Sequence, residues 1–309
     1  MSKIVIALGG NALLESGDER TYESQVRRAV SAFRNLMSVI SREDVIITHG
    51  NGPQVGDLIL RNQESKDLPP SMPMHALGAM SQGLIGEIIQ EAYDRVRLET
   101  GIGKESLVII TRTLVNGDDE AFNVPTKPVG RVYEEEEMES LKRKHPWKFV
   151  KTEKGWRRVV PSPKPLDILE KGAIQSALTA GYLPICVGGG GVPVIRKDDG
   201  FEGRDAVIDK DSASYVLAHM MEAEELIILT DVECAYINFG TEKQEALGKI
   251  GSEKLEKLYE DGQFSKGSMG PKIMAAINFV KHGGKVARIG KLQNVETILS
   301  GKSGTIVVP

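Results

Sequence analysis

Short apolar runs, each followed by a polar or glycine-rich loop, are the first pattern along the chain. Residues 4–8, 45–48, 183–187 and 226–229 are such runs, and they are rich in Val and Ile. Runs of this length without a polar face are typical of parallel strands that are buried on both sides. We expect each run to be a strand of one sheet.

Between these runs, apolar residues recur with the spacing of an amphipathic helix. Segments 85–96, 213–220 and 273–280 place them three and four positions apart, which gathers them on one helical face. Pro271 stands at the start of the third segment and Gly283 follows it, as expected for the two ends of a helix. Strands that alternate with helices predict an α/β fold with a mainly parallel sheet between helix layers.

Two stretches interrupt the alternation. Residues 116–165 contain both tryptophans, several prolines and the acidic run 134–137, which is typical of a solvated helix face. We expect this stretch to be an inserted subdomain or lid, because long insertions in compact domains are often functional. Residues 237–248 are polar and are expected to form a surface loop.

Composition narrows the class of protein. The chain has 309 residues, of which 40% are hydrophobic and 27% charged, so it can bury a large core and is not expected to be disordered. Its net charge of -4 gives no basic surplus for nucleic acid. No apolar stretch approaches the ~20 residues of a membrane span. The two cysteines suit a reducing compartment. We expect a cytoplasmic protein that binds neither nucleic acid nor membranes.

The common nucleotide-binding and metal-binding signatures are absent from the sequence. It has no phosphate-binding P-loop, no dinucleotide fingerprint and no H-E-x-x-H zinc motif. Its five histidines are far apart, without a pair at metal-ligand spacing. We therefore predict no metal site built from protein side chains alone.

Two loops combine glycine with asparagine directly after the first two strands. Glycine lets backbone N–H groups approach an anion closely, and asparagine adds an amide donor. Such loops suit a small anionic substrate, although a tight turn between strand and helix is the local alternative. The loops are Gly9, Gly10 and Asn11, and Gly50, Asn51 and Gly52.

Three lysines lie in unusual settings. Lys127 stands between a threonine and a proline in the insertion, where a surface lysine is the local alternative. Lys210 and Lys272 stand at the predicted starts of two helices, where a cation opposes the helix macrodipole. A bound anion would remove that conflict, so the pair predicts a phosphate site. Asp211 could hold the lysines or could simply cap its helix.

Further candidates lie in the last third of the chain. Thr230 and Asp231 end a buried strand, where they could contact ribose or phosphate or could form a capped turn. Tyr236 and Met269 could line an adenine slot or belong to the core. Together with the lysines, these residues suit phosphoryl transfer, which needs positioning and positive charge more than a histidine base.

As a set, the motifs resemble those of the carbamate kinases, a branch of the amino-acid kinase family. The resemblance covers nearly the whole chain. Two of its segments, 125–130 and 156–163, lie in the insertion, which acetylglutamate, aspartate and uridylate kinases do not share in this form. The matching segments are 9–12, 49–56, 79–83, 125–130, 156–163, 188–194, 207–211, 230–232 and 267–272.

The resemblance implies a three-layer αβα sandwich around a mainly parallel eight-stranded sheet, with a protruding inserted subdomain. Residues 1–210, including the lid at 116–165, would bind carbamate, and residues 211–309 would bind the nucleotide. The implied reaction is reversible phosphoryl transfer between ATP and carbamate, giving ADP and carbamoyl phosphate. Mg²⁺ would bind through the nucleotide phosphates, and the enzyme would be a homodimer.

The resemblance also assigns roles to individual residues. Lys127, Lys210 and Lys272 would contact the phosphates, and Asp211 would orient the lysines. The two glycine–asparagine loops would hold carbamate and the transferred phosphoryl group. The nucleotide would be bound by Lys210, Thr230, Asp231, Tyr236, Ser268, Met269 and Lys272.

Three alternatives remain open at this point. A kinase of the same fold could act on a phosphonate, isopentenyl phosphate or amino-acid carboxylate, although the small loops favour a small acceptor. A nucleotide-binding sensor without activity would be expected to lack at least one of the three lysines or Asp211. A scaffold that only binds oxyanions would use the lysines to stabilise helix packing.

Overall fold

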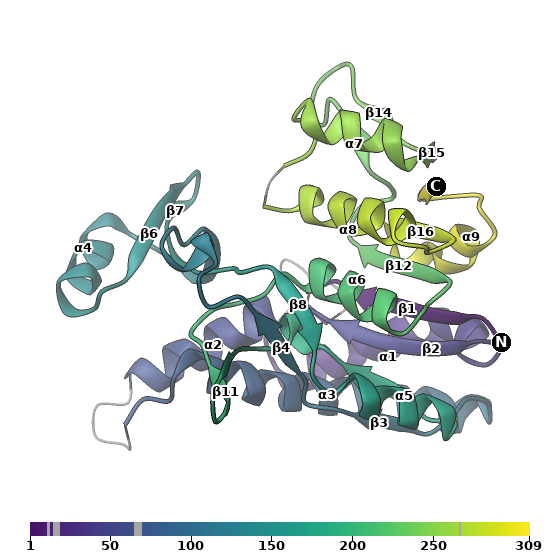
Figure 1. Cartoon of the computed structure of the whole chain (residues 1–309), viewed down its shortest axis with the longest axis horizontal. Helices are drawn as coiled ribbons and strands as arrows, with labels where there is room; N and C mark the ends of the chain where they lie inside the picture. The colour runs from purple at the N-terminus through teal and green to yellow at the C-terminus, as the bar shows by residue number, and fades with distance from the viewer. Residues whose placement is uncertain (11–12, 15–18, 65–69, 266) are drawn as a thin grey trace.

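The central sheet crosses the whole fold (Figure 1). The computed structural model describes residues 1–10, 13–14, 19–64, 70–265 and 267–309. Within these ranges the sheet has eight strands, and one neighbouring pair, the seventh and eighth strands in sequence order, is antiparallel. The predicted mainly parallel eight-stranded sheet is therefore confirmed. In sheet order the strands are β15 (Lys249–Gly251), β17 (Thr305–Val308), β16 (Val286–Lys291), β12 (Glu225–Thr230), β1 (Lys3–Leu8), β2 (Asp44–His49), β9 (Leu183–Cys186) and β3 (Ser106–Val108).

One face of the sheet is covered by two long helices. Side chains of β1 alternate between the two faces of the sheet. Ile4 and Ile6 join a buried cluster with apolar residues of α1 (Tyr22–Ile40) and α3 (Met74–Thr100). The helix predicted at 85–96 is the central part of α3.

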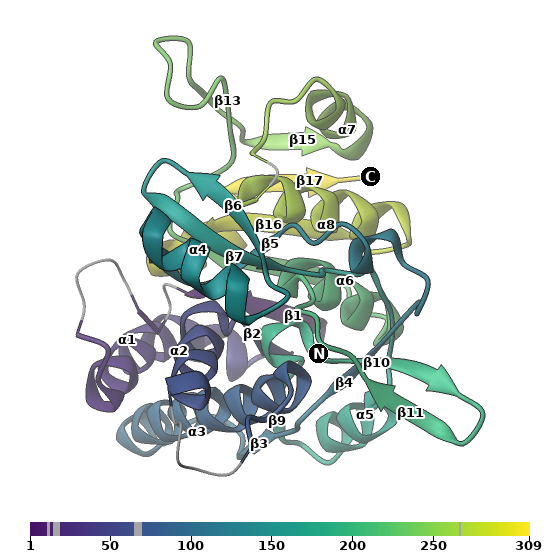
Figure 2. The same cartoon turned by 90° about the vertical axis from the view of Figure 1, so that its left-hand side faces the viewer.

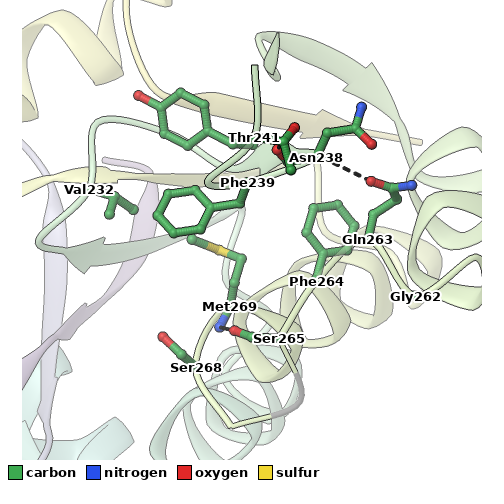
Figure 3. A pocket seen from close by; sticks show the side chains of 11 residues that line it. Val232, Asn238, Phe239, Thr241, Gly262, Gln263, Phe264, Ser265, Ser268 and Met269 are labelled. Atoms are coloured by element: carbon green, nitrogen blue, oxygen red, sulfur yellow. Dashed lines mark hydrogen bonds between the residues drawn. The ribbon is translucent and has the colours of Figure 1, made fainter. Parts of the chain in front are cut away.

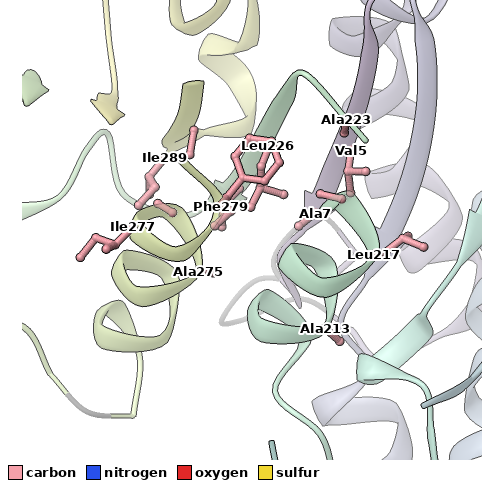
Figure 4. Close-up of a cluster of buried hydrophobic side chains, with 14 of the residues drawn as sticks. Val5, Ala7, Ala213, Leu217, Ala223, Leu226, Ala275, Ile277, Phe279 and Ile289 are labelled. Carbon is pink, nitrogen blue, oxygen red and sulfur yellow. The ribbon is translucent and has the colours of Figure 1, made fainter. Parts of the chain in front are cut away.

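The opposite face is covered by the other two predicted helices. Val5 and Ala7, the alternate residues of β1, join a second buried cluster with α6 (Lys210–Met220) and α8 (Met269–Lys281). Figure 4 shows these side chains meeting between the sheet and the two helices. Helices on both faces confirm the three-layer αβα sandwich.

Shorter helices complete the layers and connect them. Apolar residues of α5 join the cluster on the α6 side, whereas those of α9 join the cluster on the α1 side. The bounds are α2 (Gly52–Glu64), α5 (Lys171–Thr179), α7 (Ser252–Glu260) and α9 (Val295–Leu299), with 3₁₀ turns η3 (Gly188–Gly190) and η4 (Leu292–Asn294).

A second sheet marks where the insertion leaves and rejoins the body. Its strand order is β11 (Gly200–Gly203), β10 (Val192–Lys197), β4 (Arg112–Val115) and β8 (Pro165–Ile168). The strands β4 and β8 are antiparallel neighbours, and Val115 pairs with Pro165. The chain therefore departs and returns at paired positions.

The segment between these positions folds as a protruding unit of its own (Figures 1 and 2). Three antiparallel strands in the order β5-β7-β6 carry one helix. Val129 and Val160 of this unit pack against Val55 and Ile59 of α2, which attaches it to the body. Its elements are η2 (Glu120–Phe122), β5 (Lys127–Tyr133), α4 (Glu135–Lys144), β6 (Lys148–Thr152) and β7 (Gly155–Val160).

The polar segment expected to be a surface loop contains a small hairpin instead. β13 (Tyr236–Ile237) and β14 (Glu245–Ala246) pair antiparallel, so the expectation of a pure loop at 237–248 is wrong. Cys186 and Cys234 are free and buried. None of the helices in the described ranges is long and apolar enough to cross a membrane.

Candidate active site

A cavity of about 240 Å³ lies at the carboxyl ends of β1 and β2 and at the N-terminal ends of α2, α6 and α8. This is the edge of a parallel sheet where ligands of α/β proteins bind. Residues at the starts of these three helices line it, and N–H groups in the first turn of a helix have no acceptor within their own helix. Its polar lining includes Gly10, Gly50, Asn51, Gly52, Lys127, Asp209, Lys210, Asp211, Ser268 and Lys272.

Asp209 starts helix α6. Its Oδ1 accepts hydrogen bonds from the backbone N–H groups of Asp211 (3.0 Å) and Ser212 (3.1 Å), which is N-cap geometry. The alternative in which Asp211 caps the helix is therefore wrong. Capping by Asp209 leaves the side chain of Asp211 available for other contacts.

Asp211 joins two of the three lysines. Its Oδ1 lies 2.5 Å from Lys210 Nζ and its Oδ2 lies 3.1 Å from Lys272 Nζ. The carboxylate is 3% exposed, and the two lysine side chains are 12% and 14% exposed. A buried charge is stable only when it is paired, so the single carboxylate and its two ammonium groups form one unit with an excess of positive charge.

The charges of this unit are tuned by burial and by each other. Burial lowers the pKa of Lys210, and the positive charge of Lys272 acts in the same direction, whereas Asp211 raises it. Burial alone would raise the pKa of the Asp211 carboxyl, but Lys210 and Lys272 together outweigh burial and lower it. Asp211 is therefore a carboxylate at neutral pH.

The third lysine reaches the same place from the protruding unit. Lys127 is the first residue of β5, and its Nζ lies 2.8 Å from Asp209 Oδ2. The carboxylate that caps α6 thus also holds a lysine from the insertion. The structure brings Lys127, Lys210, Asp211 and Lys272 together around one cavity, although they are far apart in the sequence.

Two glycines of the predicted loops use their N–H groups within the sheet. The N–H of Gly9 donates to Leu229 O (3.0 Å) and that of Gly50 donates to Leu8 O (3.1 Å). Both N–H groups therefore extend the sheet and are already engaged. Gly9 is also absent from the described lining of the cavity, whereas Gly10 and Gly52 line it. Asn11 lies outside the described residues.

His49 is a site neighbour that the sequence did not single out for a role. It is 2% exposed, its Nδ1 lies 3.0 Å from Gly50 O, and Gly188 packs against its ring. Burial lowers its pKa to about 4, and Lys210 contributes in the same direction. The imidazole is neutral and fixes the start of the second glycine loop. Its position immediately before Gly50 was the available signal.

A second cavity has a volume of about 380 Å³, and Figure 3 shows the side chains that line it. Aromatic and sulfur-containing side chains from the β13 hairpin and from the start of α8 line it. Ser268 lines both cavities and so marks where they meet. Tyr236, Ser268 and Met269 were predicted here, whereas Val232, Asn238, Phe239, Gln263, Phe264 and Ser265 were not.

Thr230 and Asp231 are placed outside both cavity linings. The Thr230 hydroxyl donates to Asp231 Oδ1 (3.0 Å), so the two side chains engage each other at the end of β12. Within the described residues neither lines the 240 Å³ or the 380 Å³ cavity. Their contact with a nucleotide stays a prediction.

The carboxylates of the site offer little to a metal ion. In the described ranges of the chain, no group of three or more His, Cys, Asp or Glu side chains could hold one. Asp209 and Asp211 each bind an ammonium group instead.

Comparison with known proteins agrees with this arrangement. Residues 2–291 match the model of the amino acid kinase family. The carbamate kinase of Thermoplasma acidophilum is 50% identical over 309 residues, and that of Thermoplasma volcanium 49% identical over 310 residues, with both chains covered completely in each case. The solved structure of Giardia lamblia carbamate kinase bound to AMP-PNP has a TM-score of 0.92 and is 40% identical, covering 99% of this chain and 98% of that chain.

Proposed function

This chain belongs to the amino acid kinase family, and from that premise we propose that it is a carbamate kinase. It transfers the γ-phosphoryl group of ATP reversibly to carbamate, giving ADP and carbamoyl phosphate. Full-length relatives with this name, 42–50% identical, support the assignment, as does the shared fold.

The chemistry needs little covalent help from the protein. A carboxylate oxygen of carbamate attacks the γ-phosphorus, and the bond from that phosphorus to the oxygen bridging it to the β-phosphorus breaks. The attacking oxygen is already an anion, so no proton has to leave and no histidine base is needed. What lowers the barrier is fixed positive charge beside oxygens whose charge changes in the transition state.

The single observation that carries the proposal is the unit of Asp211 with Lys210 and Lys272. We assign the two lysines to the phosphoryl oxygens and Asp211 to holding them in place. Lys127, which comes from the protruding unit, supplies a third cation when that unit covers the site. Asp209 positions both Lys127 and the start of α6.

The two adjoining cavities support a division of labour along the chain. We propose that residues 1–210 bind carbamate, with Gly10, Asn51 and Gly52 at the acceptor, and that residues 211–309 bind the nucleotide. The larger cavity, with Tyr236 and Met269, accepts adenine, and the smaller one accepts the phosphates and carbamate. The roles predicted for Gly9, Gly50, Asn11, Thr230 and Asp231 remain part of the proposal.

A magnesium ion fits this site only through the nucleotide. Because the two nearest carboxylates already bind lysines, we propose that Mg²⁺ arrives on the nucleotide phosphates and keeps water ligands. Bound there, the ion would supply positive charge to the phosphate oxygens. We also propose that the enzyme is a homodimer in the cytoplasm, which light scattering of the purified protein and fractionation of the source cells would test.

The test is ATP synthesis from MgADP and carbamoyl phosphate. We expect the wild-type protein to form ATP and Lys210→Ala to lose about 100-fold or more in kcat. Lys281→Ala, which removes a surface lysine bound to Glu256, is the matched control and should keep full activity. No ATP from a wild-type protein that still binds MgADP would refute carbamate as the acceptor.

A further inference from the structure

Two neighbouring residues of α3, Ser81 and Gln82, are almost completely buried, at 0% and 2% exposure. They lie in the segment 79–83, which the proposed function leaves without a role. Most buried polar side chains form hydrogen bonds, and both of these do. Ser81 bonds to Asn51, which lines the smaller cavity, and Gln82 bonds to Thr111, which supports the chain just before the loop 188–191.

Ser81 determines how the side-chain amide of Asn51 is turned. The Ser81 hydroxyl donates its one proton to Gly78 O at 2.7 Å. Its oxygen can therefore only accept from Asn51, whose Nδ2 lies 2.8 Å away. Nδ2 must face Ser81, and Oδ1 must be the free end of the amide.

Gln82 supports, through Thr111, the loop that packs against that amide. It makes a two-fold pair with the backbone of Thr111, at 3.0 Å to its carbonyl and 2.9 Å from its N–H. The Thr111 hydroxyl accepts from the N–H of Val187 at 3.0 Å, just before the loop 188–191. In that loop Gly189 touches the Asn51 amide so closely that a Cβ would lie 2.1 Å from Nδ2.

Asn51 is thus clamped between α3 and the 188–191 loop, and it lines the cavity of about 240 Å³. Its Oδ1 receives no hydrogen bond from any residue in the described ranges of the chain. An amide carbonyl oxygen that faces the bound substrate accepts a hydrogen bond from an N–H group of that substrate. It forms no hydrogen bond with a methyl group in the same place.

From this geometry we propose that Ser81 is a positioning residue that sets acceptor specificity. By turning the Asn51 amide, it makes Oδ1 accept a hydrogen bond from the amino group of the substrate. This favours carbamate and carbamoyl phosphate over the isosteric acetate and acetyl phosphate. The inference rests on the proposed function, because it concerns the acceptor of the same site.

The experiment measures kcat/KM for ATP formation from MgADP with carbamoyl phosphate and, separately, with acetyl phosphate. In Ser81→Ala the amide loses the partner that fixes it, and we expect the ratio of the two values to fall about tenfold. The KM for ADP should stay near the wild-type value, because the nucleotide contacts are untouched. Ser81→Cys, close in size but with a weakly hydrogen-bonding sulfur, should lower the ratio in the same direction and serves if the alanine variant does not fold.

Thr305→Val is the matched control. It also removes a fully buried hydroxyl, with bonds to Leu247 O at 2.6 Å and from Ala235 N at 2.9 Å. It should lower the melting temperature but leave the ratio unchanged. An unchanged ratio in folded Ser81 variants would overturn this inference alone. A wild-type protein that makes no ATP from carbamoyl phosphate would overturn the proposed function and the inference with it.

Discussion

Thr48 on β2 and Ser214 on α6 share a hydrogen bond of 2.6 Å, and both side chains are completely buried. The Ser214 hydroxyl donates to Lys210 O at 2.7 Å, so Thr48 is the donor of the pair. Two residues beyond Thr48 lies Gly50, at the acceptor side of the site. This bond therefore connects the acceptor loop to the first turn of the helix that carries Lys210.

Replacing Thr48 by Val tests this connection. The change keeps the shape and removes the donor, so we expect the free energy of unfolding to fall by about 1–2 kcal/mol. Because the acceptor loop and Lys210 lose a common support, kcat should fall about fivefold with little change in the KM for ADP. Thr305→Val should cost similar stability in urea unfolding and leave kcat alone. Equal kcat losses in both variants would contradict the connection.

Asp211→Asn removes the charge between the two lysines. We expect kcat at pH 7 to fall about 100-fold, because the ammonium groups repel each other and lose their common anchor. Asp211 raises the pKa of Lys210, which burial already lowers, so its loss lowers that pKa further. The alkaline limb of the pH–kcat profile should move to lower pH. A variant with the wild-type alkaline limb would refute this coupling, and Asp94→Asn, at a surface ion pair with Arg97, provides the control profile.

His49 makes stability depend on pH in a calculable direction. Its pKa is lowered from 6.5 to about 4 by burial. Between these pH values the unfolded chain therefore binds a proton at His49, whereas the folded protein does not. Above pH 6.5 His49 has no effect on the pH dependence of the free energy of unfolding. As the pH falls from 6.5 toward 4, it lowers that free energy progressively, and below pH 4 its effect no longer changes. The total is about 3 kcal/mol.

Urea unfolding of wild type, His49→Gln and His282→Gln from pH 7.5 to pH 4 measures this effect. In the wild type and in the variant of the exposed His282, protonation of the unfolded chain at this position should lower the free energy of unfolding by this amount as the pH falls. His49→Gln should lose about 3 kcal/mol less over that range. Parallel curves for all three proteins would show that His49 is protonated in the folded state.

Deletion of the protruding unit tests its role as a lid. Because Val115 and Pro165 already pair, a short Gly–Ser turn can join β4 to β8 and leave the body folded. Lys127 is lost with the unit, and water gains access to the site, so ATP formation should fall by at least about 100-fold. A thermal shift on adding MgADP should persist. Full activity in the deleted protein would refute the lid.

Phe239→Ala tests the adenine cavity. The centroid of the Phe239 ring lies 6.1 Å from the ring centroid of Tyr236, and the residue is 67% exposed. An exposed ring in this position can stack on an aromatic ligand. We expect the KM for ADP to rise about tenfold and kcat to change little. Phe201→Ala, at an exposed phenylalanine of β11, should leave both constants unchanged. A lower kcat with unchanged KM would place the ring elsewhere in the reaction.

The layers of the fold could be predicted because buried parallel strands and amphipathic helices leave distinct periods in the sequence. A phosphate site at Lys210 and Lys272 could be predicted because both stand at predicted helix starts, but only the resemblance added Lys127 to them. The place of Lys127 depends on how the inserted unit packs against the body. Local sequence also could not decide between Asp209 and Asp211 as the cap. Each is a good N-cap residue one position from Lys210, and only the point where α6 begins separates them.

The larger cavity was the least predictable part. Phe239 lies in a polar segment, and its partners Gln263 and Phe264 come from the other side of α7. They form a cavity only when β13 pairs with β14 and the hairpin lies against the start of α8. An isolated phenylalanine within a polar stretch was the one local signal, and it does not say which residues will face it.

The alternation of side chains along β1 has a consequence for how the protein reaches its active form. Ile4 and Ile6 face one core and Val5 and Ala7 the other, so a slip of one residue would send each side chain to the wrong core. It would also displace Gly9 and Gly10 by about 3.3 Å. Since β1 is aligned with β2 and β12 on both sides, a chain trapped in the shifted alignment has neither a sound interior nor an acceptor loop in reach of Lys210. Folding errors at this strand therefore yield unstable protein that is open to degradation, rather than stable but inactive enzyme.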